Sequence, residues 1–262
     1  MILWHLKGNV MTLKNIAVLV LAVVIMVVAV GCAELMPARE PLPPLESIIQ
    51  PSAEPAAAPV DISARTLDYS NDYIDVDITY PEISGIRDEE TQRTINERVH
   101  NDLKSKAQAI EAQAEQDARE SRLRVKYSMD AGFSVARNDG RVLSIQIDIS
   151  TYQGGANVGT DSMFINVINE EEVIRPTFSE LFVDGADYTA VINEKIRAFI
   201  ASSPESEMFD FQTVSPDQWY YLTDAALVVV FPRYAITPGA YGEPEFVIPF
   251  DEISDILIPD VK

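Results

Sequence analysis

The chain has 262 residues, a hydrophobic content of 47% and a formal net charge of −21. Two of the 20 basic residues, Lys7 and Lys14, and none of the 41 acidic residues precede Cys32, so the segment after Cys32 carries a formal net charge of −23. This acidity excludes nucleic acid as a partner and favours cationic partners. Cys32 is the only cysteine, so packing and not disulfide bonds must stabilise the folded part.

The N-terminal segment has the pattern of a secretory signal. An apolar run over residues 16–30 follows Lys14 and precedes the small residue Gly31, as expected for such a signal. The run is shorter than the ~17–25 apolar residues that span a membrane. With Cys32 placed directly after Gly31, the segment resembles a bacterial lipoprotein signal.

That resemblance implies a modified N-terminus. Cleavage after Gly31 would leave Cys32 as the first residue, with a lipid such as palmitate attached, and would hold the protein on the outer side of a bacterial membrane. The alternative is an uncleaved membrane anchor in which Cys32 is incidental. Translation can start at Met1 or at Met11.

Residues 33–62 have the composition of a tether. Seven of the sixteen prolines lie between residues 37 and 59, with alanine-rich spacing and no hydrophobic period. Such segments are extended and partly polyproline-like. At ~3.1 Å per residue the tether would reach up to about 90 Å from the membrane.

Residues 63–151 predict a first folded unit. Alternating apolar residues over 73–80 predict a half-buried strand. Asp88 is an expected N-cap, and apolar residues at spacings of three and four predict a long helix from there to about Arg119. Strands are expected over 123–136 and 142–151, joined by a turn at 138–140, where Asn, Asp and Gly tolerate positive φ.

Residues 152–262 predict a second unit. A helix is expected over 188–202 from its apolar spacing, and a short helix or turn over 178–182. The predicted strands are 164–168, 219–223, 226–231 and 246–250, followed by a short helix from Asp251. Helices and antiparallel hairpins without regular alternation indicate an α+β fold, built as two small mixed units of antiparallel strands packed with helices.

Several of these stretches resemble one protein family. They are Tyr80-Pro81 with Ile95-Asn96, then 151–157 (TYQGGAN), 219–223 (WYYLT), 231–234 (FPRY), 237–242 (TPGAYG) and 247–250 (VIPF). Together they resemble the extracytoplasmic portion of the RsiV-like family of lysozyme-sensing anti-sigma factors. Similar domains precede the catalytic domain of PdaC-type peptidoglycan deacetylases. The family pattern has a histidine where this chain has Asn157.

Catalytic and metal-binding patterns are weak. His100 is the only histidine after Cys32 and is expected at the boundary of the long helix, so triads and His-rich zinc sites have little support. Asp75 and Asp77 share a strand face and offer ligands to Ca²⁺, although a solvated face is the favoured interpretation. We therefore expect no enzyme, no metal and no cofactor.

The candidate binding site is the loop around residues 237–244. Pro238 restricts it, and Tyr241 offers an amphipathic ring of the kind enriched at interface hot spots. With Tyr152 and Asn157, these residues form the predicted partner-binding set. The expected function is that of an envelope lipoprotein that binds a lysozyme-type cationic protein or peptidoglycan. The alternatives are a cell-wall hydrolase with paired carboxylates and a structural envelope protein.

Overall fold

The computed structural model describes residues 58–262. Cys32, the predicted signal and most of the predicted tether lie outside the described residues. Within 58–262 no helix combines the length and the apolar character that a membrane crossing needs. The described residues belong to one compact unit.

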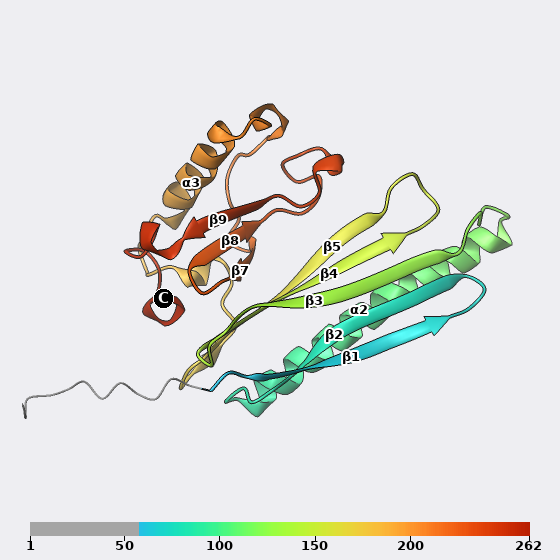
Figure 1. Ribbon diagram of the computed structural model, residues 1–262, viewed down its shortest axis with the longest axis horizontal. Helices are drawn as coiled ribbons and strands as arrows, with labels where there is room; N and C mark the ends of the chain where they lie inside the picture. The colour runs from blue at the N-terminus through green and yellow to red at the C-terminus, as the bar shows by residue number, and fades with distance from the viewer. Residues whose placement is uncertain (1–57) are drawn as a thin grey trace, which may run out of the picture. The chain divides into compact units, whose positions relative to one another are not determined.

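The first half of the described chain builds a six-stranded sheet of order β1-β2-β3-β4-β5-β6 (Figure 1). Neighbouring strands are antiparallel except for β2 and β3, which are parallel. The strands are β1 (Asp61–Ser70), β2 (Ile74–Ser84), β3 (Tyr127–Asn138), β4 (Val142–Tyr152), β5 (Gly159–Asn169) and β6 (Val173–Ile174).

Helix α2 (Glu89–Arg119) covers one face of this sheet (Figure 1). Asp88 caps it by accepting a hydrogen bond from the amide of Thr91, and Glu89 and Glu90 stand in the first turn, where the helix dipole favours acids. Its buried stripe packs against the sheet to form the first core. The apolar members of that stripe are those expected from the spacing: Ile95, Val99, Leu103, Ala107, Ile110 and Ala114.

The second half builds a three-stranded antiparallel sheet of order β7-β8-β9. Its strands are β7 (Trp219–Leu222), β8 (Ala226–Val230) and β9 (Glu245–Pro249). Helix α3 (Tyr188–Ser202) and several short 3₁₀ turns enclose a second core with this sheet. The turns are η2 (Ser179–Leu181), η3 (Ser206–Met208), η4 (Gly239–Tyr241), η5 (Phe250–Glu252) and η6 (Pro259–Val261).

Two buried hydrogen-bond pairs join the sheets. The Ser144 hydroxyl accepts from the amide of Leu222 at 2.9 Å, and Asn166 donates to the carbonyl oxygen of Tyr220 at 2.9 Å. Ser144 also donates to Asn166 at 2.7 Å. Because these groups are buried and fully paired, they fix where β7 crosses the open face of β4 and β5.

The α+β fold expected from the sequence is confirmed. Strand β1 was not predicted: it begins at Asp61, so the last two residues of the expected tether belong to it. The chain also stays in the six-stranded sheet beyond residue 151, because β5 pairs with β4. The expected helix from Asp251 is only the 3₁₀ turn η5. The division into domains stays a prediction.

Candidate functional site: an acidic pocket beside an aromatic loop

The open face of the six-stranded sheet, opposite α2, is strongly acidic. Asp68, Asp77 and Asp130 stand in one row across β1, β2 and β3, where they are direct register partners, and all three are exposed. Like charges placed directly opposite each other in a sheet are destabilising. A row of three carboxylates is therefore held at some cost in stability.

A pocket of about 540 Å³ opens on this face. Five acidic residues line it, and its lining contains no lysine or arginine: Asp77, Asp130, Asp148, Asp161 and Glu243. Of these, Asp161 is ion-paired with Lys106 of α2. All but Glu243 come from the sheet, and Glu243 reaches in from the loop before β9. The pocket is thus a concentrated site of negative potential in which a cationic group would be attracted.

Glu243 connects the loop to the sheet. Its carboxylate accepts a hydrogen bond from the Ser162 hydroxyl of β5 at 2.6 Å. Burial raises the pKa of the Glu243 carboxyl, and the neighbouring charges of Asp161 and Asp148 raise it further against the opposing effect of Ser162. A cation entering the pocket would favour the ionised form of Glu243.

The loop over residues 231–244 is an aromatic rim beside the pocket. Tyr234 adopts a positive φ of 70° and is 68% exposed. Its ring lies against Gly239, where a Cβ atom would come within 2.0 Å of the ring carbons. The strained backbone and the exposed ring together are features that concentrate at functional sites.

Arg233 ties this rim to the β4–β5 loop. Its Nε donates to the carbonyl oxygen of Gly239 at 2.6 Å, and Nη1 donates to the carbonyl oxygen of Val158 at 2.6 Å. The guanidinium also lies 5.2 Å from the centre of the Tyr234 ring. One side chain therefore holds two loops together that are far apart in the sequence.

The predicted partner-binding residues fall around this link. Pro238 and Asn157 are exposed, and Asn157 directly precedes Val158. Tyr241 is 37% exposed, and its ring packs edge-on against Phe209 at a centroid distance of 5.1 Å. Tyr152 is half-buried at the end of β4, opposite Ser128 of β3. The structure therefore brings the loops of Pro238 and Asn157 together through Arg233.

The remaining candidates have structural partners. His100 is half-buried, and its Nδ1 lies 2.8 Å from the Tyr80 hydroxyl. Asp75 accepts from Lys126 at 2.7 Å and from Ser70 at 2.6 Å. In the part of the chain that the structure describes, no group of three or more His, Cys, Asp or Glu residues could hold a metal ion.

Sequence reasoning did not single out Glu243, Asp130, Asp148 or Arg233. The two aspartates carried a signal, because each stands between apolar residues of its strand, Asp130 in β3 and Asp148 in β4, as the acids of β2 do. Arg233 lies in the 231–234 stretch and Glu243 in the candidate loop, but their roles depend on contacts with β5 and with the β4–β5 loop, which the sequence does not show.

Comparison with known proteins confirms the resemblance. Residues 67–160 match the family model described as deacetylase PdaC, and residues 179–251 match the DUF3298 family of unknown function. The two matched regions follow one another along the chain. It is similar to the anti-sigma-V factor RsiV of Bacillus subtilis, with 27% identity over 199 residues, 71% of this chain and 67% of that protein.

Two solved structures share the fold. A DUF3298 family member from Bacteroides fragilis has a TM-score of 0.58 at 14% identity, covering 79% of this chain and 96% of that chain. A DUF3298 family protein from Pseudomonas aeruginosa has a TM-score of 0.53 at 19% identity, covering 79% and 97%. At these identities the likeness concerns the fold alone.

Proposed function

We propose that this protein is a non-enzymatic extracytoplasmic binding module that holds a cationic protein of lysozyme type over the acidic pocket. The observation that carries the proposal is the pocket itself, with five lining acids, of which only Asp161 has an ion-pair partner, Lys106. The similarity to RsiV also supports a cationic protein partner, because the family resemblance implies a partner of lysozyme type. Peptidoglycan, a largely neutral or anionic glycan, suits such a pocket less well.

The geometry supports a two-part contact. The acidic pocket attracts and orients basic side chains of the partner, while the rim formed by Pro238, Tyr234 and Tyr241 supplies apolar contact area. Charged pockets act mainly on encounter and orientation, and aromatic anchors act mainly on residence time. In this proposal Cys32 carries the lipid that anchors the module to the membrane.

The test is surface plasmon resonance, in which hen egg-white lysozyme binds to the full chain. Replacing Asp130→Asn and Asp148→Asn together removes two pocket charges and should weaken binding about tenfold or more, chiefly through slower association. The matched control is Glu171→Gln with Glu172→Gln, which removes two exposed charges of the β5–β6 turn. Equal losses in both double variants would refute the pocket as the contact.

A second assay separates binding from hydrolysis. A binding module should protect cells or cell walls from lysozyme in a plate assay, whereas a hydrolase would itself clear the wall. Muropeptide release by the purified chain, abolished when Asp148 or Glu243 is replaced by its amide, would favour the hydrolase instead.

A further inference from the structure

Strand β5 has no neighbour along most of its outer edge. Strand β6 pairs only with Ile168 and Asn169, so residues 159–167 form a free edge within the part of the chain that the structure describes. The backbone N–H and C=O groups of an unpaired edge are a template for a further strand. The free edge of β5 is therefore a candidate interaction surface.

The ladder shows which backbone groups of β5 are free. In an antiparallel strand, the backbone groups of successive residues point alternately to the two sides. The amide of Asn169 donates to the carbonyl oxygen of Arg141 at 2.7 Å, on the β4 side, whereas Ile168 faces β6. Even-numbered residues therefore point outward. Within residues 58–262, three of their amides have no hydrogen-bond partner: those of Thr160, Phe164 and Asn166.

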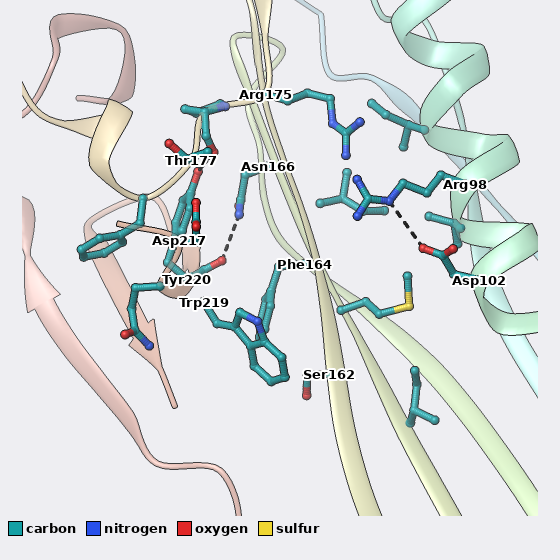
Figure 2. Close-up of a pocket in the computed structure, with 18 of the residues that line it drawn as sticks. Arg98, Asp102, Ser162, Phe164, Asn166, Arg175, Thr177, Asp217, Trp219 and Tyr220 are labelled. Carbon is teal, nitrogen blue, oxygen red and sulfur yellow. Dashed lines mark hydrogen bonds and ion pairs between the residues drawn. The ribbon is translucent and has the colours of Figure 1, made fainter. Parts of the chain in front are cut away.

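The free edge lies in a groove. A second cavity of about 540 Å³ is lined by five consecutive residues of β5, 162–166. Consecutive side chains of a strand point to opposite faces, so a cavity that touches all five follows the edge. Figure 2 shows α2, with Arg98 and Asp102, on one side of β5 and Trp219 of β7 on the other. We call this cavity the edge groove.

Both walls of the edge groove offer apolar surface. Val99 and Met163 line it on the side of α2, and Phe164 and Trp219 line it on the opposite side, with their ring centres 5.9 Å apart. The basic side chains of α2 in this lining are already ion-paired with carboxylates. The groove therefore suits an extended segment with apolar side chains on both of its faces, which would gain main-chain hydrogen bonds from the edge.

We propose that residues 45–50 of this chain (LESIIQ) bind the edge groove as a further strand of the sheet. Pro44 and Pro51 bracket this segment, which is the longest run without proline between residues 37 and 59. Proline has no amide to donate and interrupts a ladder, so the rest of that stretch cannot pair over a comparable length. Six residues are a usual strand length.

The side chains of the segment match the two walls. Ile48 and Ile49 are β-branched and favour strands. As neighbours in a strand they point to opposite faces, so one meets the wall on the side of α2 and the other meets the wall formed by Phe164 and Trp219. The fit needs no particular register, because both walls are apolar along the groove.

The segment can reach the groove. Val60 exchanges two hydrogen bonds with Asn138 in the turn before β4, and the side chain of Asn169 donates to the same turn at 3.1 Å. The described chain thus begins at the end of the sheet where β5 ends. The eight residues after Gln50 span up to about 26 Å, more than the ~17 Å of β5 between Phe164 and Asn169. The segment then runs parallel to β5, as β2 does to β3.

Docking of the segment would shorten the tether. With the lipid of the proposed function on Cys32, residues 33–44 alone would separate the membrane from the groove. At ~3.1 Å per residue they reach about 37 Å, against about 90 Å for the whole tether. The docked segment would hold the acidic pocket nearer the membrane. This consequence rests on the proposed function, whereas the docking itself does not.

Amide hydrogen exchange of the full chain, followed residue by residue by NMR, tests the proposal. The outward amides of Phe164 and Asn166 should exchange about tenfold or more slowly in the parent than in Ile48→Pro, because proline interrupts the added strand. The matched control is Ala53→Pro, which adds a proline outside the segment and should exchange as the parent does. Equal exchange of the amides of α2 in all three chains checks that the fold is intact.

Three results would overturn the proposal. They are equal exchange of the outward amides in the parent and in Ile48→Pro, equal acceleration by both proline variants, and protection that persists in Ile48→Pro and disappears on dilution. The last result would assign the edge to a second copy of the chain. Lysozyme binding is measured on the same variants, because it reports on the acidic pocket and the exchange reports on the edge groove.

Discussion

Arg137 donates a hydrogen bond through Nη1 to the backbone carbonyl oxygen of Val261 at 2.6 Å, which ties β3 to the C-terminal turn. The guanidinium is 6% exposed, pairs with Asp139 at 2.7 Å and lies 5.9 Å from the centre of the Phe250 ring. A buried charge is stable only when it is paired in this way. Arg137 therefore holds the six-stranded sheet and the second core together.

Replacing Arg137→Leu should lower the free energy of unfolding by about 2–3 kcal/mol, since a charged hydrogen bond is lost and the Val261 carbonyl is left without its partner. Urea denaturation measures the loss. The control is Arg65→Leu, which breaks the exposed ion pair with Glu82 and should cost at most ~1 kcal/mol. An Arg137→Leu variant as stable as this control would show that the link is dispensable.

Acid stability should depend on Asp117. Hydrogen bonds from Tyr127, then Arg122 and Gln113, lower the pKa of the Asp117 carboxyl from 3.8 to about 2. Because the folded-state pKa is depressed, the ionised carboxylate stabilises the fold above about pH 4, and this contribution disappears as the pH falls toward 2.

Asp117→Asn should therefore be less stable than the parent at pH 7, and the difference should shrink between about pH 4 and pH 2. Urea midpoints measured across that range supply the comparison. A difference that does not change with pH would mean that Asp117 titrates at an ordinary pKa.

Gly239 should be required for the shape of the rim. Any side chain there meets the Tyr234 ring, so Gly239→Val must displace that ring and should weaken lysozyme binding about tenfold while the chain stays folded. Gly155→Ala is the matched control in the neighbouring loop, because its added Cβ atom meets nothing within 4 Å. Undiminished binding by Gly239→Val would remove the rim from the contact.

Tyr241 should slow the dissociation of the bound partner. Truncation to Ala removes its half-exposed ring from Phe209 and should cost ~2 kcal/mol of binding free energy if the ring is a hot spot, mostly as faster dissociation. Raising salt past ~0.15 M should instead slow association. Plasmon resonance at two salt concentrations separates these effects. A dissociation rate that stays the same in Tyr241→Ala would contradict the anchor role.

Membrane attachment should depend on Cys32. Cys32→Ser removes the thiol that would take the lipid, so the variant should accumulate as unprocessed precursor or as released protein. Cell fractionation and intact-protein mass spectrometry measure both forms. Membrane association of the serine variant at the processed mass of the parent would disprove lipid attachment at this position.

Local sequence patterns determined the elements whose hydrophobic period is strong. Helix α2 followed from its apolar spacing and from Asp88, and helix α3 begins and ends at the predicted residues. The turn before β4 followed from Asn138-Asp139-Gly140, where Gly140 has a φ of 88°. In these segments the residues that set the conformation are neighbours along the chain.

Tertiary structure decided what depends on pairing between distant residues. Strand β1 is an edge strand whose residues are mostly exposed, so it shows little alternation, and its register with β2 rather than its own pattern makes it a strand. The same holds for the acidic pocket. Asp77 and Asp130 meet because β2 and β3 are parallel neighbours. The chemistry of each side chain could be read from the sequence. Which side chains lie together depended on the order of the strands in the sheet.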